Sequence, residues 1–221
     1  MSQLLTFQTK PPKSIFAPVG KYYIFEDNIS NVLNFNTIKN TILKKEKEII
    51  KKYPFVDDGN TGLGDSLTSR FPHFNLLEWP EMVDIKNSIR KTHNKFLKLI
   101  NEDYNIELFS QCWANVMRKG DVIKKHSHYN SNYTYLGGHI CIQSNNTSTH
   151  YVDPYTKEIF SSKNEFGKIT LFPNWIEHYT DKVVDNKLRI TIAFDLINKV
   201  TFKEDIYNNM KHHWIKLWQK K

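Results

Sequence analysis

A succession of short β-like segments in the second half of the chain does most to constrain its fold. From Glu107 onward, β-branched and aromatic residues form segments that are separated by Gly, Pro, Asn and Asp: ELFSQCWANVM, DVIKKHSH, NYTYLGGHICIQ, STHYVDP, KITLF, EHYTDKV and LRITIAFDL. Short strands at regular spacing with turn signals are typical of a sandwich or barrel of the jelly-roll kind. We therefore predict a mainly β protein (α+β) with a jelly-roll core and helices packed on the outside.

Two helices are predicted in the first half of the chain. The first begins at Asn36 and Thr37, carries isoleucines at helical spacing, and ends before Pro54 because the residue preceding a proline disfavours helix. The second begins at Pro80 and Glu81, since proline and an acidic residue suit the first turn of a helix. Both helices are expected to pack their apolar face on a sheet.

We expect a single domain over residues 1–221, because a chain of this length supports one sizeable core. Residues 1–106 are expected to provide strand and helical support, residues 107–198 the β core, and residues 199–221 an amphipathic C-terminal helix. That helix would pack against the barrel or form the contact of a homodimer. The loop at 57–64, DDGNTGLG, lacks the lysine of a phosphate-binding loop and the glutamate of an EF-hand, and is expected to be a flexible connection.

The composition favours a globular protein without a membrane span. Hydrophobic residues make up 39% and aromatic residues 14% of the chain, and no apolar run approaches the roughly 20 residues that cross a bilayer. The first residues lack a secretory signal, which predicts a cytosolic location, or the host cytosol if a phage encodes the chain. Cys112 and Cys141 are expected to be free, buried thiols.

The net charge of +8 raises the question of a nucleic-acid partner. The lysines are dispersed along the chain and no nucleic-acid-binding motif is present, so direct binding to nucleic acid is not favoured. Abundant Lys, Asn and Ile are also typical of an AT-rich genome, as in many phages. The charge is therefore partly compositional.

Three histidines form a candidate metal site. His126 and His128 are separated by one residue, so on a strand both side chains point to the same face. His178 would complete a three-ligand face with open positions for other ligands. His178 and Arg189 flank a polar turn at 183–186, and residues equally distant from a hairpin turn lie opposite each other.

Arg189 begins the apolar segment RITIAF, where a buried charge without a partner is costly. An anion is therefore expected beside it, either an acidic side chain such as Asp195 or a carboxylate-bearing ligand. The remaining histidines that lack a partner pattern are interpreted as structural, namely His73, His93, His212 and His213. Four aromatic residues border the motifs and would line a substrate pocket or fill the core: Trp113, Tyr129, Tyr133 and Trp175.

The segments HSHYNSNY, FPNWIEHYTDKV and RITIAFDL together resemble the end of the non-haem Fe(II), 2-oxoglutarate-dependent dioxygenases, in particular a phage and bacterial branch near the prolyl 4-hydroxylase-like enzymes. The resemblance covers roughly residues 111–196. It implies a double-stranded β-helix and the cofactors Fe(II) and 2-oxoglutarate. It also implies that the enzyme hydroxylates a peptidyl, prolyl or small-molecule substrate and releases succinate and CO2.

The resemblance further implies roles for single residues. His126 and His178 correspond to metal ligands, and Arg189 to the partner of the 2-oxoglutarate C5 carboxylate, assisted by Thr191. The family pattern has Asp or Glu where this chain has His128, so either His128 or Asp153, in YVDPY, is expected as the second ligand. Their positions inside the barrel make two more residues candidates for contact with the cosubstrate: Asn115 and Tyr135.

Two other functional classes stay open. The first is a cupin-like metalloprotein that binds iron through three histidines without 2-oxoglutarate, and the second is a nonenzymatic binding module on the same barrel. Arg189 and Thr191 distinguish the dioxygenase from the cupin-like metalloprotein. The binding module would instead use its charge to hold an acidic partner, in a salt-sensitive way and without retaining a metal.

Overall fold

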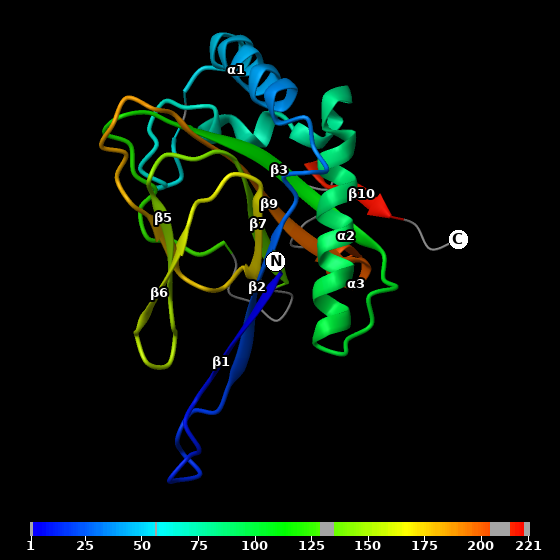
Figure 1. Ribbon diagram of the computed structural model, residues 1–221, viewed down its shortest axis with the longest axis vertical. Coiled ribbons are helices and arrows are strands. Elements are labelled where there is room, and N and C mark those ends of the chain that lie inside the picture. The colour runs from blue at the N-terminus through cyan, green and yellow to red at the C-terminus, as the bar shows by residue number, and fades with distance from the viewer. Residues whose placement is uncertain (1, 56, 129–134, 204–212, 219–221) are drawn as a thin grey trace.

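The computed structural model describes residues 2–55, 57–128, 135–203 and 213–218 and contains two antiparallel sheets (Figure 1). The large sheet has the spatial order β1 (Gln3–Gln8), β2 (Lys21–Asn28), β7 (Lys168–Pro173), β4 (Leu136–Gln143), β9 (Arg189–Asn198), β3 (Leu108–Met117) and β10 (Ile215–Trp218). The small sheet has the order β6 (Ile159–Lys163), β5 (Ser148–Val152) and β8 (His178–Thr180). An aromatic cluster with Tyr22, Tyr151 and Phe172 packs the two sheets together.

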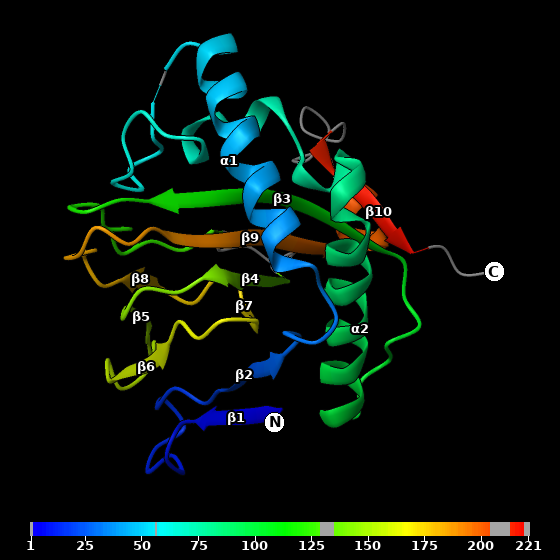
Figure 2. The same ribbon diagram turned by 45° about the horizontal axis from the view of Figure 1, so that its top comes forward.

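Helices cover the outer face of the large sheet (Figure 2). The side chain of Asn34 accepts a hydrogen bond from the Thr37 N–H and so caps α1 (Phe35–Lys52). A short 3-10 turn, η3 (Pro80–Met82), leads directly into α2 (Val83–Leu99). Helix α1 begins and ends close to where the sequence predicts, and the helical segment of η3 and α2 begins at the predicted Pro80. The other short helices are η1 (Thr68–His73), η2 (Leu76–Glu78) and α3 (Lys199–Lys203).

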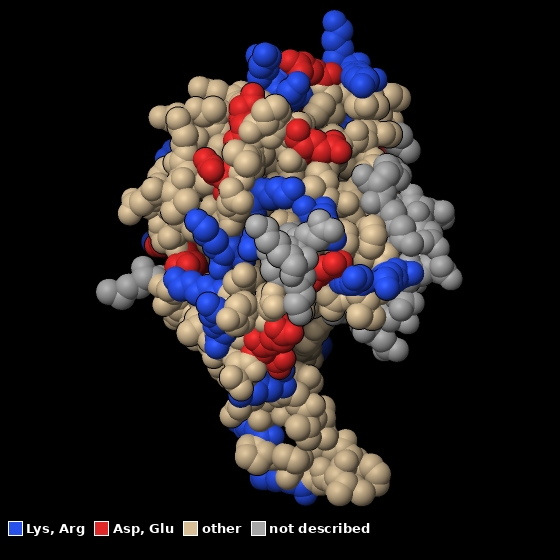
Figure 3. All heavy atoms as spheres, turned by 90° about the vertical axis from the view of Figure 1, so that its right-hand side faces the viewer, with Lys and Arg blue, Asp and Glu red and all other residues tan. Residues whose placement is uncertain are grey.

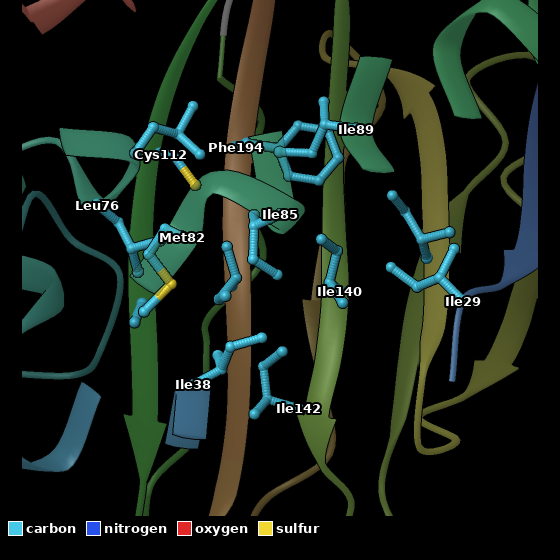
Figure 4. Close-up of a cluster of buried hydrophobic side chains, with 14 of the residues drawn as sticks. Ile29, Ile38, Leu76, Met82, Ile85, Ile89, Cys112, Ile140, Ile142 and Phe194 are labelled. Carbon is cyan, nitrogen blue, oxygen red and sulfur yellow. The ribbon is translucent and has the colours of Figure 1, made fainter. Parts of the chain in front are cut away.

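Side chains of the central strands point alternately to the two faces of the large sheet. On the helix-facing side, Ile85 and Ile89 of α2 belong to one buried cluster with Cys112, Ile140 and Phe194 (Figure 4). The residues between these apolar positions point the other way, toward the small sheet. Burying large aliphatic side chains contributes about 1.5–3 kcal/mol each, so this cluster holds the strands that carry the polar face.

Gly138 is one position where the packing requires glycine. A Cβ atom at Gly138 would lie 2.4 Å from the ring of Phe194 on the neighbouring strand β9. The missing side chain lets the phenylalanine ring lie flat against β4 beneath α2. Any larger residue would push the ring away and loosen the central strand pair.

The predicted fold class and most predicted strands are confirmed. A mainly β chain with a jelly-roll core and outer helices is what the structure contains. Two details differ: the segment DVIKKHSH forms only an isolated bridge between His126 and His178, and β6 was not predicted. Cys112 and Cys141 are free and buried, as expected.

The expected boundaries of the β core are too narrow. Strands β1 and β2 from the support region and β10 from the C-terminal region join the large sheet. The expected helix over 199–221 is wrong at its end, because residues 215–218 form β10. This strand pairs with the otherwise open edge of β3, and Trp214 and Leu217 are buried. Of the rest of this predicted helix, 204–212 and 219–221 lie outside the described residues, so the homodimer contact stays a prediction.

The surface carries its charges in mixed order. Lysine and arginine side chains are interspersed with acidic ones on the face shown in Figure 3, where the β1–β2 hairpin projects as a mostly uncharged arm. In the part of the chain that the structure describes, no helix is long and apolar enough to cross a membrane.

Candidate metal and cosubstrate site

A cavity of about 480 Å³ lies between the two sheets. Strand β9 contributes Arg189, Thr191, Ala193 and Asp195, whose side chains share one face because they are spaced by two residues. Strand β3 contributes Gln111, Trp113 and Asn115 in the same way. The small sheet closes the opposite side.

The three predicted metal ligands meet in this cavity. His126 pairs with His178 of β8 through two backbone hydrogen bonds, and the His128 N–H donates to the Asn174 carbonyl. One possible ligand atom from each histidine lies within 4.8 Å of the other two. The ring centroids of His126 and His178 are 4.4 Å apart, and those of His128 and His178 are 5.1 Å apart.

The Nδ1 atom of each of these three rings is engaged in a hydrogen bond. His126 Nδ1 donates to the Lys124 carbonyl at 2.7 Å, and His178 Nδ1 donates to the Ile176 carbonyl at 2.9 Å. His128 Nδ1 donates to Asp195 Oδ1 at 2.5 Å. Because carbonyl and carboxylate oxygens accept, these bonds place a proton on each Nδ1, and in the neutral ring they leave the Nε2 lone pair free. A free Nε2 lone pair can bind a metal.

Burial and neighbouring charges set the protonation of the cluster. Burial, followed by the proximity of the other two imidazoles, holds the pKa of His178 well below its usual value. Burial and His128 also lower the pKa of His126. Burial acts in the same direction on His128, but the charge and hydrogen bond of Asp195 outweigh it and raise the pKa. His126 and His178 are consequently neutral near pH 7, the form that binds a metal.

Arg189 lies in the same cavity without an anionic partner. Its side chain is 2% exposed, Nη1 contacts Met117 Sδ at 2.9 Å and Thr191 Oγ1 at 3.4 Å, and Nε has no hydrogen-bond partner. No carboxylate forms an ion pair with this guanidinium within the described residues. Burial lowers the pKa of Arg189 to about 10. A buried cation with spare donors is a binding site for a carboxylate.

Thr191 and Asn115 extend this polar end of the cavity. Asn115 Nδ2 donates to Thr191 Oγ1 at 3.4 Å, and its Oδ1 accepts from Thr68 Oγ1 of η1 at 2.8 Å. The two residues face each other in the β3–β9 register. They therefore lie beside Arg189, as the sequence analysis expects.

Tyr135 does not belong to this cavity. Its hydroxyl is 2.8 Å from His93 Nε2 of α2, and it lines a separate hollow near the end of the large sheet. The strand begins only at Leu136, so the alternation used to place Tyr135 inside the barrel does not extend to it. The expected cosubstrate contact is wrong for this residue.

Two other expectations about partners are corrected. Asp153 does not belong to the histidine cluster or line the cavity; its carboxylate accepts from the Tyr22 hydroxyl and from the N–H groups of Tyr155 and Thr156. His178 and Arg189 do not face each other in a hairpin, because β8 pairs with β5 of the small sheet whereas β9 lies in the large one. They meet in the cavity because the two sheets pack face to face.

The sequence analysis assigned no site role to Asp195 beyond a pairing with Arg189. In the structure its carboxylate instead contacts His128. The period of two residues along RITIAFD contained the signal, because it places residues 189, 191, 193 and 195 on one face. His139 and Gln111 were also missed, and both line the cavity.

The glycine-containing loop forms part of the cavity wall and has internal order. Both carboxylate oxygens of Asp58 accept N–H groups, from Asn60, Gly62 and Gly64. Asp57 and Asp58 line the cavity from this loop. The loop is therefore more than a connection between elements, whereas its flexibility stays a prediction.

Some of the aromatic and histidine residues singled out in the sequence line the cavity, and others pack elsewhere. Trp113 lines the cavity, whereas Trp175 packs beside Tyr22 in the cluster between the sheets. His93 has a structural contact with Tyr135, and His73 stacks on Tyr53 at 4.3 Å. Tyr129, Tyr133 and His212 lie outside the described residues, and His213 is buried beside β10.

Part of this chain matches a known protein family. Residues 111–195, from β3 to Asp195 of β9, match a family described as "Putative 2OG-Fe(II) oxygenase". No curated protein sequence matches the chain. The match does not distinguish a phage or bacterial branch.

Solved structures similar to this chain include three oxygenases. One is an oxidoreductase of the 2OG-Fe(II) oxygenase family from Burkholderia pseudomallei, with 16% identity, coverage of 48% of this chain and 51% of that chain, and a TM-score of 0.41. A Pseudomonas putida prolyl-4-hydroxylase has 9% identity, coverage of 80% and 88%, and a TM-score of 0.49. HygX from Streptomyces hygroscopicus, solved with nickel and 2-oxoglutarate bound, has 12% identity, coverage of 57% and 70%, and a TM-score of 0.43.

The matched segment spans both sides of the cavity just described. Its two ends, Gln111 and Asp195, face each other in the β3–β9 register, and the three histidines and Arg189 lie between them in the sequence. Residues 111–195, which carry the cavity, are similar to a family of 2OG-Fe(II) oxygenases.

Proposed function

We propose that this chain hydroxylates a peptidyl, prolyl or small-molecule substrate in a reaction that consumes 2-oxoglutarate and O2 and releases succinate and CO2. The observation that carries the proposal is the presence, in one cavity, of three imidazoles with free Nε2 atoms and a buried guanidinium without a counterion. The imidazoles suit a divalent metal, and the guanidinium suits one end of a dicarboxylate.

In this proposal His126, His128 and His178 hold Fe(II) through their Nε2 atoms. The residues fit the metal because each Nδ1 is already engaged in a hydrogen bond and two of the rings have lowered pKa values. Three protein ligands leave positions open for cosubstrate and oxygen. Bound iron and 2-oxoglutarate supply the oxidising chemistry that converts a substrate C–H bond into C–OH.

Arg189, Thr191 and Asn115 would bind and orient the 2-oxoglutarate. A carboxylate at Arg189 would provide the missing counterion and accept from the Nε–H that now lacks a partner. The Thr191 hydroxyl, 3.4 Å from Arg189 Nη1, offers one more donor in the same place. This contact would orient the cosubstrate without taking part in proton transfer.

The mouth of the cavity would receive the substrate. Phe71 and Pro72 of η1 and Trp113 of β3 line it, and the Phe71 and Trp113 rings lie 5.7 Å apart. Such a surface suits an apolar ring or a short aliphatic segment. A prolyl ring or a small cyclic metabolite fits this description, and the surrounding apolar groups would exclude bulk water from the reacting C–H bond.

Anaerobic titration tests the proposal directly. Wild-type protein is expected to bind Fe(II), and addition of 2-oxoglutarate should produce the visible charge-transfer band of the metal chelate. His178→Ala should lose the band because it removes a metal ligand. His150→Ala is the matched control, since this histidine contacts Ser161 and Asp181 and does not line the cavity.

The outcomes separate the functional classes. If well-folded wild-type protein binds iron but 2-oxoglutarate changes neither its spectrum nor its affinity, the cupin-like alternative is correct. If it binds no iron at all, the nonenzymatic alternative is correct. Release of succinate from 2-oxoglutarate in air would then measure turnover without knowledge of the substrate.

A further inference from the structure

Asp195 has a distinctive place beside the candidate metal ligands. Its Oδ1 accepts from His128 Nδ1 at 2.5 Å, and the two side chains are only 6% and 13% exposed. Within the described residues, His128 is the only cationic or imidazole group that pairs with this carboxylate. The bond is therefore short, shielded from water and exclusive to one ring.

The other two rings of the cluster have neutral acceptors. His126 donates to the carbonyl of Lys124, and His178 donates to the carbonyl of Ile176. A carbonyl fixes the orientation of a ring but adds no charge. His128 alone is bonded to a carboxylate, and it stands where the family pattern has Asp or Glu.

The difference matters for the charge around a bound dication. Three neutral imidazoles provide no negative charge, whereas two imidazoles and a carboxylate provide one. A carboxylate that accepts the Nδ1–H of a ligating imidazole increases the basicity of Nε2 and transmits part of its charge to the metal. The His128–Asp195 pair together has the formal charge of the carboxylate that is replaced.

The strand register makes room for this carboxylate. Gly137 of β4 lies directly opposite Asp195 of β9, and a Cβ atom at Gly137 would be 3.4 Å from Asp195 Oδ1. That distance is van der Waals contact, and the same Cβ would be 3.3 Å from Asn174 Cβ and from the Phe172 ring, so only a small residue fits beside the carboxylate. Burial of a carboxylate is costly unless a positive group compensates it, and a dication at the His128 Nε2 would do so.

We propose that Asp195 is a positioning residue, which holds His128 with Nε2 toward the metal and supplies through that ring the negative charge that a carboxylate ligand would provide directly. This inference rests on the proposed function, because it assumes that the three histidines bind a metal. It concerns the strength and electronic character of metal binding, and it assigns Asp195 no contact with substrate.

The test uses Co(II) as a spectroscopic probe that needs no anaerobic handling, with affinity from calorimetric titration and ligand geometry from the visible d–d spectrum. Asp195→Asn preserves the shape of the side chain and removes its charge. Loss of the carboxylate that accepts the hydrogen bond of a ligating histidine is expected to weaken Co(II) binding 10- to 100-fold. The d–d bands should also shift, which a purely structural role would not cause.

Two further variants make the test specific. Asp181→Asn removes the carboxylate from the His150–Asp181 pair outside the cluster, and it should leave Co(II) affinity unchanged. His128→Asp/Asp195→Asn places a carboxylate in the ligand position itself, and it should recover at least tenfold of the affinity that Asp195→Asn loses. Thermal unfolding without metal confirms that each variant is folded.

The outcomes distinguish the two levels of the argument. If wild-type protein binds no Co(II) and no Fe(II), the proposed function fails and this inference fails with it. If wild type binds metal and Asp195→Asn binds it equally with an unchanged spectrum, only the inference is overturned. The inference is also overturned if the double variant His128→Asp/Asp195→Asn binds Co(II) as weakly as Asp195→Asn alone. Asp195 would then affect metal binding by a route other than His128.

Discussion

Replacement of Arg189 by methionine should have opposite effects on the empty protein and on cosubstrate binding. The guanidinium is buried and has no anionic partner among the residues that the structure describes, and burial lowers its pKa to about 10 from 12.5. This difference corresponds to about 3 kcal/mol by which the folded environment disfavours the charged side chain. Methionine fills similar space without charge, so the ligand-free variant should be as stable as wild type or up to about 3 kcal/mol more stable.

Binding should respond in the other direction. Removal of one partner of a buried, hydrogen-bonded charge pair costs roughly 2–5 kcal/mol, so the affinity for 2-oxoglutarate should fall at least about 30-fold. Urea unfolding at pH 7 measures the free energy of unfolding, and calorimetric titration of the Mn(II)-loaded protein measures 2-oxoglutarate affinity without turnover. Metal affinity itself should remain, because Arg189 is not one of the three imidazoles.

Arg70→Met provides the matched control. Arg70 is also 2% exposed, but it has an ion pair with Asp65 and donates to the carbonyls of Tyr53 and Ser66. Its replacement leaves those carbonyls without a donor and should lower stability by about 1–3 kcal/mol. The reasoning is refuted if Arg189→Met loses stability as Arg70→Met does while 2-oxoglutarate affinity is retained, since Arg189 would then be a structural residue.

Three further predictions concern the scaffold. Burial lowers the pKa of His93 to about 4, so the stability that its neutral form allows is complete above pH 6.5 and is lost as the pH falls toward 4. Urea unfolding at pH 7 and at pH 4.5 measures this loss, which His93→Gln should reduce by up to about 3 kcal/mol. An unchanged pH dependence in the variant would contradict the prediction. The half-exposed Arg118 pairs with the buried carboxylate of Glu46 at 2.8 and 3.0 Å. Arg118→Ala should lower stability by about 1–3 kcal/mol, more than Glu46→Gln does, because it leaves that carboxylate buried without a partner. Equal shifts of the unfolding temperature in the two variants would argue against this. Tyr135→Phe should lower stability by about 1 kcal/mol, because it removes the hydrogen bond to His93, and it should leave the affinity for 2-oxoglutarate unchanged. A lower 2-oxoglutarate affinity in calorimetric titration would show that Tyr135 does contact the cosubstrate.

The local pattern of the sequence predicted the elements that bury one face. In β9, the residues Ile190, Ile192 and Phe194 alternate with polar ones, and this period of two identifies both the strand and its two faces. The proline and capping signals located α1 and α2 for the same reason, since they act within a few residues. Strands β6 and β10 were missed because a segment of four or five residues fits the period of a helix as well as that of a strand.

The contacts between side chains in the site were harder to predict than the strand face on which each side chain lies. The motif His126-Ser127-His128 indicated a metal, but the strand geometry used to explain it was wrong, because this segment lies outside the named strands and is held by a bridge to His178. Arg189 was expected beside an anion, and its acidic neighbour on the strand, Asp195, turned out to contact His128. Sequence spacing specifies which residues share a face, and it does not specify which of them touch.

Hydrophobic periodicity and the donor types of histidine and arginine are local properties, so they were enough to predict the strands, the outer helices and the chemical character of the cavity. The folded structure was needed to show that β8 and β9 lie in different sheets, that Asp195 contacts His128, and that Tyr135 turns toward α2. These contacts depend on how one sheet packs over the other. That packing is set by side chains far apart along the chain, such as Tyr22, Tyr151 and Phe172.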